Sequence, residues 1–236
     1  MLDITHLTAR VQSKIILKDF SYNFKDNHTY VIMGPNGSGK STLANCIMGH
    51  PHYELDKKSR IALNKKNITE LSSDKKAKLG IFLSFQSPLS LQGVTVFQLL
   101  RVALAGKRDA FELKKELFRE AKKLKIRADI LERSLNEGSS GGERKKIEVL
   151  QAAVLQPKVA IFDEVDTGVD VDALKTISFF MKTFKKNKTI IFITHNSRIL
   201  KYINPDTVLI LKEGCLVKEG GKELLAQIES QGFEKL

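Results

Sequence analysis

The stretch Gly34–Thr42, with the sequence GPNGSGKST, has the residue types of a loop that binds phosphate groups. It fits the pattern G-x-x-x-x-G-K-[ST], in which glycines let the backbone curl until several N–H groups point at one anion. Lys40 would neutralise the terminal phosphates of a nucleotide, and the Ser41 hydroxyl would bind a hard cation such as Mg²⁺. The sequence therefore predicts nucleotide binding. The candidate binding residues are Gly34, Pro35, Asn36, Gly37, Ser38, Gly39, Lys40, Ser41 and Thr42.

Two carboxylates, Asp163 and Glu164, follow directly after the apolar run Val159–Phe162. Because neighbouring side chains of a strand point to opposite sides, the two acids at its end face in different directions. One can face a metal ion through its water shell, and the other can face the water that attacks a phosphate. For an isolated pair, two acids that end a strand in solvent would be the plainer interpretation. The phosphate-binding loop favours the catalytic one.

A third group of small residues, Ser139–Glu143, stands at the expected start of a helix. Backbone N–H groups exposed at the positive end of a helix form an anion site. Lys145 and Lys146 follow in the first turn, where positive charge opposes the helix dipole unless an anion lies nearby. On its own this pattern is more often a helix cap, so its weight comes from the other motifs. The candidate anion-binding residues here are Ser140, Gly141, Gly142 and Glu143.

A phosphate-binding loop needs a strand before it and a helix after it, and the pattern predicts both, over 29–33 and about 40–48. Further strands are expected at 15–17, 20–24, 81–85, 159–162, 189–194 and 207–211, and helices at 94–104, 110–126, 142–156, 171–184, 198–203 and from 222. The first strands should be antiparallel. The alternation of strand and helix after Pro157 predicts a largely parallel sheet buried on both faces, and the charged helices of the middle third read as an insertion.

Composition sets outer limits on the function. The chain has 236 residues, of which 42% are hydrophobic and 28% charged, which excludes a disordered or collagen-like protein. No apolar run approaches the roughly 20 residues of a membrane helix. The net charge of +12 would favour anionic partners, but most of the basic residues are lysine, whereas recognition of bases relies on arginine. We therefore expect a solvated lysine-rich surface and no specific nucleic-acid binding.

The two cysteines, Cys46 and Cys215, lie far apart and have no neighbours with the spacing of a metal site. No secretory signal stands ahead of the first strands, so a reduced compartment is expected. Both cysteines are expected to be small buried hydrophobic residues.

Three further residues complete an ordered set of motifs: Gln86 after a strand, Asp170 in the loop after the acidic pair, and His195 after another strand. With this set the chain resembles the nucleotide-binding subunits of the ABC ATPase superfamily over nearly its whole length. The resemblance implies that Gln86 is a magnesium ligand and a sensor of the γ-phosphate. It also implies that Glu164 polarises the attacking water and that His195 contacts the γ-phosphate. The implied catalytic residues are Glu164, His195, Gln86 and Asp163, and the implied magnesium ligands are Ser41, Gln86 and, through water, Asp163.

The same resemblance implies an α/β fold, a P-loop NTPase of ABC type with a mixed core sheet, N-terminal antiparallel strands and an inserted helical lobe. The chain, 1–236, would be a single ABC ATPase domain, with a core lobe of about 1–90 and 155–236 and a helical lobe of about 91–154. In this family the signature N–H groups of one subunit close over the ATP held by the other. ATP, Mg²⁺ and an ATP-dependent homodimer are therefore implied, with Asp170 in the dimer loop.

Finer similarity indicates one branch of the family, the SufC-type ATPases of the SUF system for iron–sulfur cluster assembly. The similar stretches are 49–54, 82–95, 140–146 and 163–174. Glu143, where many transport ATPases have glutamine, agrees with this branch. The resemblance implies scaffold partners similar to SufB and SufD, which dock through the region after Gln86 and the helical lobe. It implies a cytoplasmic or plastid-like location and no direct insertion into a membrane.

Two other functions stay open on the sequence. The chain could be the ATPase subunit of a membrane transporter, with the same nucleotide chemistry and a permease partner. A nucleic-acid or ribosome-associated ATPase would make use of the net charge, but such relatives usually carry two tandem ATPase units.

Overall fold

The structure, a computed structural model, describes residues 1–195 and 198–233 and consists of two compact units. Unit 1 comprises residues 1–83, 157–164 and 185–236, and unit 2 comprises residues 84–156 and 165–184. The family resemblance implies that 165–184 belongs to the core lobe and that the helical lobe begins near residue 91. In the structure the helical unit begins at Ser84 and includes 165–184, because the helix in that segment packs against another helix of unit 2.

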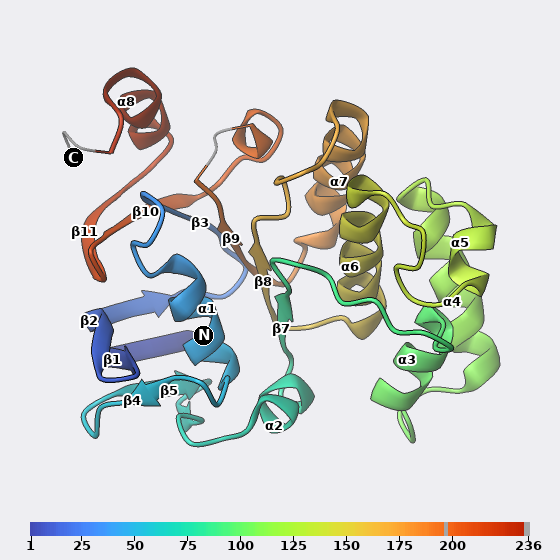
Figure 1. The fold of residues 1–236 in the computed structure, drawn as a ribbon, viewed down its shortest axis with the longest axis horizontal. Helices are drawn as coiled ribbons and strands as arrows, with labels where there is room; N and C mark the ends of the chain where they lie inside the picture. The colour runs from blue at the N-terminus through green and yellow to red at the C-terminus, as the bar shows by residue number, and fades with distance from the viewer. Residues whose placement is uncertain (196–197, 234–236) are drawn as a thin grey trace. The chain divides into compact units, whose positions relative to one another are not determined.

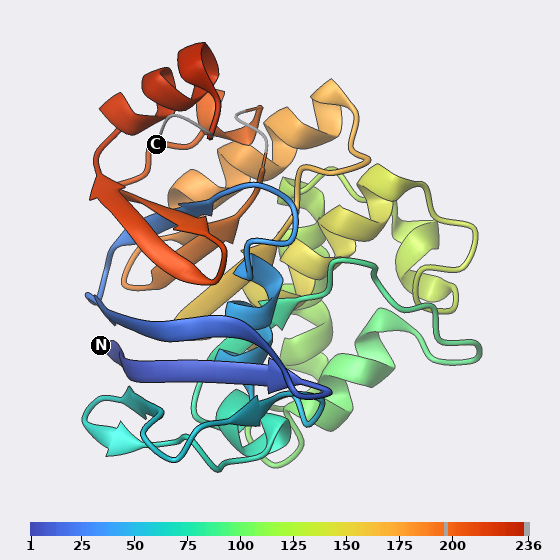
Figure 2. The ribbon, with the colours of Figure 1, turned by 60° about the vertical axis from the view of Figure 1, so that its left-hand side comes forward.

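The first sheet of unit 1 is antiparallel, with the order β2-β1-β5-β6 and with β4 paired to β1. Its strands are β1 (Leu2–Val11), β2 (Lys14–Phe24), β4 (Glu54–Leu55), β5 (Arg60–Leu63) and β6 (Lys66–Asn67). Figure 2 shows β1 and β2 side by side near the N-terminus. The two short strands expected at 15–17 and 20–24 form the single strand β2. They are continuous because a β-bulge joins them: Asp19 has a φ of 54°, and the register with β1 shifts there.

The second sheet of unit 1 has the order β11-β10-β3-β9-β8-β7. Its strands are β3 (Thr29–Met33), β7 (Ile81–Ser84), β8 (Val159–Asp163), β9 (Thr189–Ile193), β10 (Thr207–Lys212) and β11 (Cys215–Gly220). Strands β10, β3, β9 and β8 are parallel, and β11 turns back antiparallel to β10. Every residue of β3, β8 and β9 is buried, which confirms the prediction of a sheet covered on both faces.

Helix α1 (Lys40–Met48) lies in the hydrophobic core of unit 1 (Figure 1). Its buried side chains, among them Leu43 and Ile47, share that core with residues of both sheets. The helix follows β3 through the glycine-rich loop and ends at Gly49, whose φ of 77° is typical of a helix C-terminus. The predicted strand, loop and helix are therefore confirmed.

The other helices of unit 1 are α2 (Ser73–Lys78), the 3₁₀ turn η1 (Ile199–Lys201) and α8 (Glu223–Gln231). The helix expected over 198–203 is wrong, because only the single turn η1 forms there. Pro205 disfavours a helical conformation at Asn204, so the segment is too short for an α-helix.

Unit 2 is helical, as the pattern predicts. Its helices are α3 (Val96–Ala103), α4 (Ala110–Lys123), α5 (Ala128–Glu132), α6 (Gly141–Leu155) and α7 (Val171–Phe184). On α4 the buried Leu113, Leu117 and Ala121 recur every four residues and form one apolar stripe. Helix α6 packs against α3, α4 and α7, so most of its side chains are buried.

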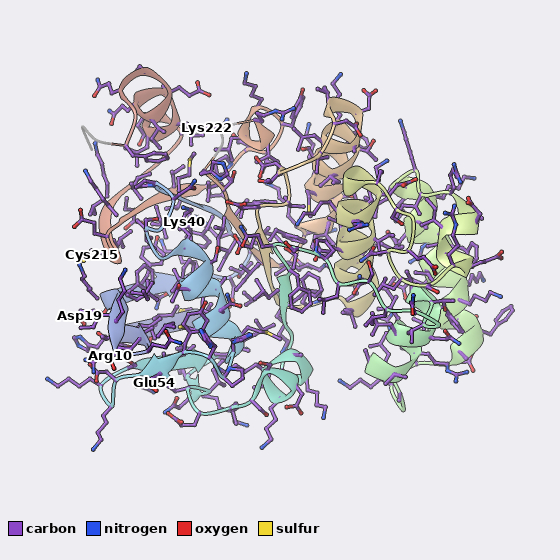
Figure 3. All side chains as sticks on the ribbon, in the orientation of Figure 1. Arg10, Asp19, Lys40, Glu54, Cys215 and Lys222 are labelled. Atoms are coloured by element: carbon purple, nitrogen blue, oxygen red, sulfur yellow. The ribbon has the colours of Figure 1, made fainter. Side chains whose placement is uncertain are left out.

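The two cysteines differ in exposure. Cys46 is buried in α1, and burial raises the pKa of its thiol to about 12. Cys215, which Figure 3 labels at the start of β11, is partly exposed, so the expectation of two buried cysteines is wrong for this one. It begins β11, the edge strand of the sheet. Among the described residues, no helix has the length and apolar character needed to cross a membrane.

Lys76 of α2 is fully buried, with an exposed fraction of 0%. Its ammonium group lies 3.4 Å from the carbonyl oxygen of Cys46, near the C-terminal end of α1. Burial lowers the pKa of Lys76 to about 8, because the charged form loses its hydration. Folding therefore carries an electrostatic cost at neutral pH, and this cost disappears as the ammonium loses its proton.

We expect the stability of the wild-type protein relative to Lys76→Met to rise between pH 8 and pH 10. The folded lysine loses its proton near pH 8, whereas the unfolded one keeps it to about 10.4, so the unfolded state binds more protons in this window. The relative gain should be on the order of 2 kcal/mol. Urea unfolding across this range measures it, with Lys78→Met as the control because Lys78 is exposed on the same helix. If the free energy of unfolding changed with pH in the same way in Lys76→Met and Lys78→Met, the lowered pKa of Lys76 would be contradicted.

Candidate functional site

The glycine-rich loop after β3 has a backbone that only glycine can adopt at two positions. Gly34 has a φ of 154°, and a Cβ there would lie 2.0 Å from the carbonyl oxygen of Leu211. Gly39 has a φ of 100°, in the left-handed region that side chains disfavour. Inside the loop, the N–H of Ser38 donates to the carbonyl of Pro35 at 3.2 Å. The loop is thus a tight, closed curve in front of the N-terminus of α1, as a phosphate cradle requires.

The ammonium group of Lys40 lies inside this curve. It donates to the carbonyl oxygens of Gly34 and Pro35, both at 2.9 Å, and only 6% of the residue is exposed. Burial lowers the pKa of Lys40, while the negative charges of Glu164 and Asp163 partly oppose that shift. A bound phosphate group would offer the buried ammonium a negatively charged partner in place of the neutral carbonyl oxygens.

The parallel order β3-β9-β8 brings three chemical groups to one edge of the sheet. The phosphate-binding loop follows β3, the acids 163–164 end β8, and His195 comes after β9. In parallel strands all carboxyl ends lie at the same edge, which is where α/β proteins bind ligands. Asp163 is buried, with 4% exposed, at the last position of β8.

Glu164 and His195 are joined by a hydrogen bond. Nδ1 of His195 lies 2.8 Å from Oε1 of Glu164, and the histidine side chain is 39% exposed while that of the glutamate is 13% exposed. The backbone of Glu164 has a φ of 50°, a left-handed conformation that costs about 1 kcal/mol or more for a non-glycine residue. Its N–H donates to the carbonyl of Ile193 at 2.8 Å, which holds it there. Strain of this kind is typical of functional sites.

The predicted signature Ser140–Glu143 lies in unit 2 and forms the first turn of α6. The Ser140 hydroxyl accepts a hydrogen bond from the Glu143 N–H at 3.2 Å, and the Glu143 carboxylate accepts one from the Ser140 N–H at 2.8 Å. These reciprocal bonds are a capping box. The plainer interpretation, a helix cap, is therefore present in the structure, and anion binding at this turn stays a prediction.

The signature glycines pack against the segment that precedes α7. A Cβ on Gly141 would lie 2.6 Å from the carbonyl oxygen of Gly168, and one on Gly142 would lie 3.2 Å from Oδ2 of Asp170. Asp170 has its own structural task, because its Oδ1 accepts a hydrogen bond from the Ala173 N–H at 2.8 Å. Hydrogen bonds from backbone N–H groups, that of Ala173 first, lower the pKa of Asp170. This cap was not foreseen for the residue assigned to the dimer loop.

Gln86 also lies in unit 2, where its carbonyl oxygen accepts a hydrogen bond from the buried Lys145 of α6 at 3.0 Å, and the N–H of the preceding Phe85 donates to the buried Glu148 at 2.8 Å. The anion that compensates Lys145 near the start of the helix is Glu148, whose Oε2 lies 3.4 Å from Nζ of the lysine. Sequence reasoning missed Glu148. The available signal was an acid three residues after a lysine on a face that is otherwise apolar.

The predicted site residues thus fall into two sets. The phosphate-binding loop, Asp163, Glu164 and His195 come together in unit 1, whereas Gln86, the signature residues 140–143 and Asp170 belong to unit 2. Within 1–195 and 198–233, no three side chains of the types His, Cys, Asp and Glu lie close enough to hold a metal ion together.

The chain is similar to known proteins over most of its length. A family model described as ABC transporter matches residues 17–167. Vegetative protein 296 of Bacillus subtilis (strain 168) is 40% identical over 240 residues, which cover 99% of this chain and 92% of that protein. The probable ATP-dependent transporter slr0075 of Synechocystis sp. (strain ATCC 27184 / PCC 6803 / Kazusa) is 40% identical over 246 residues, which cover 100% of this chain and 95% of that protein.

The fold is similar to that of solved ATP-binding cassettes. The dimeric structure of a post-hydrolysis state of the cassette MJ0796, bound to ADP and Pi, has a TM-score of 0.81 at 21% identity and covers 94% of this chain and 98% of that one. The fold class expected from the sequence is therefore confirmed. The family match over more than half of the residues and the 40% identity over 99% of the chain show that it belongs to the ABC transporter family, as an ATPase cassette.

Proposed function

We propose that this ATPase cassette hydrolyses ATP in a two-fold dimer and powers iron–sulfur cluster assembly on a soluble scaffold. The observation that carries the hydrolytic part is the meeting of a phosphate-binding loop, Lys40, and the Glu164–His195 pair at one edge of a sheet. The cluster-assembly part rests on the sequence stretches that resemble SufC-type ATPases.

The proposed binding step uses groups of the glycine-rich loop. Backbone N–H groups of the loop and the N-terminus of α1 would bind the phosphate chain, and Lys40 would exchange its two carbonyl partners for phosphate oxygens. The exchange is favourable because a buried ammonium gains more from an anion than from neutral carbonyls. Loop geometry thus supplies position and charge, which are the main contributions to phosphoryl transfer.

The proposed hydrolytic step uses Glu164 and His195. The carboxylate of Glu164 would orient a water molecule and accept its proton, and its hydrogen bond to His195 at 2.8 Å fixes the orientation of the carboxylate. His195 would contact the γ-phosphate. The strained backbone of Glu164 keeps its side chain at this position at the end of β8.

The residues of this edge fit magnesium. The hydroxyl of Ser41 follows Lys40 in the first turn of α1, and the buried carboxylate of Asp163 ends β8, so both donors are the oxygen ligands that this cation prefers. Gln86 would add an amide oxygen. Bound there, magnesium would neutralise charge on the β- and γ-phosphates.

The dimer part of the proposal gives a role to unit 2. The first turn of α6, with Ser140 as its cap and small residues after it, would present its positive end to the ATP of a second copy. The cassette MJ0796 is described as dimeric with ADP and Pi, which supports this assembly. Asp170 would lie at the contact between the copies.

We expect Lys40→Ala to abolish tight ATP binding, because the loop would lose its only ammonium side chain. Titration with a fluorescent ATP analogue at constant ionic strength measures the dissociation constant. Lys58→Ala serves as the control, since Lys58 is exposed and away from the loop in sequence. Unchanged affinity of Lys40→Ala would show that the loop is not the phosphate site.

Glu164→Gln should bind ATP normally but hydrolyse it roughly 10²–10⁴ times more slowly, because the amide cannot accept a proton. The variant should accumulate as an ATP-bound dimer, which size-exclusion chromatography with light scattering would detect. Turnover equal to that of the wild-type protein would remove Glu164 from the mechanism.

The Synechocystis relative is named as a probable ATP-dependent transporter, which favours transport as the second candidate function. The identity of the partner distinguishes transport from cluster assembly. We expect affinity purification of the tagged Glu164→Gln protein with ATP, from its native cells, to recover two soluble β-rich subunits similar to SufB and SufD. Recovery of a permease would instead assign the cassette to a membrane transporter.

A further inference from the structure

Two opposite charges are buried side by side on α6. Lys145 and Glu148 are each only 4% exposed, and Nζ of the lysine lies 3.4 Å from Oε2 of the glutamate. Replacing such a pair with apolar residues is often neutral or stabilising, so a buried ion pair is weak evidence for a contribution to stability. Its presence calls for another role, and its remaining hydrogen bonds show where that role lies.

Three hydrogen bonds of the pair go to the backbone of the two residues that follow β7. Oε1 of Glu148 accepts a hydrogen bond from the Phe85 N–H at 2.8 Å. Nζ of Lys145 donates to the carbonyl oxygens of Phe85 and Gln86, both at 3.0 Å. The pair thus binds both the donor and the acceptor of one residue and the acceptor of the next.

Two large apolar side chains of the segment 85–89 are exposed. Phe85 is 55% exposed and Leu89 is 58% exposed, so neither anchors the segment by hydrophobic burial. Gln86 itself is exposed. Charge-assisted hydrogen bonds inside a buried environment are strong and directional, and here they hold the backbone while they leave the glutamine side chain accessible.

We propose that Lys145 and Glu148 are positioning residues that fix the backbone of Gln86, and through it the reach of the Gln86 amide toward the γ-phosphate and magnesium. The inference rests on the proposed function, because it takes the role of Gln86 from there. The pair acts on the reaction only indirectly, because it contacts no substrate and transfers no proton. It acts by holding the segment 85–86 in one conformation before ATP arrives.

Two variants and a matched control test the proposal. Lys145→Met/Glu148→Leu removes both charges at once, so no unpaired charge stays buried and the fold should persist. Glu148→Gln keeps an oxygen that can accept from the Phe85 N–H but removes the charge. The control is Lys146→Met, because Lys146 is the neighbouring lysine on α6 and is only partly buried.

The first measurement is hydrogen exchange of the Phe85 amide in the nucleotide-free protein. In the double variant the amide should exchange about 10 to 100 times faster, since a hydrogen bond to a charged group is lost. The exchange rate in Glu148→Gln should lie between those of the double variant and the wild-type protein, and the rate in Lys146→Met should equal that of the wild-type protein. Unchanged exchange in a folded double variant would overturn the proposal, whatever the protein's activity.

The second measurement is ATP turnover. The double variant should lose roughly 10- to 100-fold in kcat, the effect of a misplaced group, while KM for ATP stays close to that of the wild-type protein because the phosphate-binding loop is intact. A change in KM alone, or no change, would overturn the positioning role. Gln86→Ala separates the two proposals: if its turnover equals that of the wild-type protein, the proposed role of Gln86 fails even where the exchange result holds.

Discussion

The parallel pairing of β3, β9 and β8 is the constraint on which the site depends. Three segments that are distant in sequence end at one edge of this sheet, and each ends in a chemical group: a phosphate-binding loop, a pair of acids, and a histidine. The strands themselves are wholly buried, so their register is fixed by apolar packing on both faces. A one-residue slip of β8 would turn Asp163 and Glu164 to opposite sides and separate Glu164 from His195.

The site contains one electrostatic and one conformational strain, and the surrounding structure maintains both. Lys40 keeps a charge in a place where burial opposes it, and two nearby acids partly compensate. Glu164 keeps a left-handed backbone that its bond to Ile193 maintains. Both features are unfavourable for the isolated protein and become useful when a phosphate and a water molecule are bound.

Local patterns allowed much of the fold and of the site to be predicted. The glycine loop, the acids after β8 and the helical stripe of α4 depend on neighbouring residues, and their positions were found. The bulge at Asp19 and the short turn η1 were missed, because they depend on strand register and on the end of a segment. The Lys145–Glu148 pair was missed in part, because its meaning lies in contacts with a loop some 60 residues earlier in the chain. Which carbonyl a buried charge reaches is a property of tertiary packing.

The close approach of Gly34 to Leu211 links the phosphate loop to the hairpin of β10 and β11. The Gly214 N–H in that hairpin donates to the carbonyl of Ser38 at 3.0 Å, and a Cβ on Gly214 would itself lie 2.2 Å from the carbonyl of Ile16. The turn at Gly214 between β10 and β11 therefore helps to fix the conformation of the phosphate-binding loop. The shape of the loop limits which residues this turn can accept. Nucleotide binding should therefore constrain the sequence of the β10–β11 hairpin as well as that of the loop.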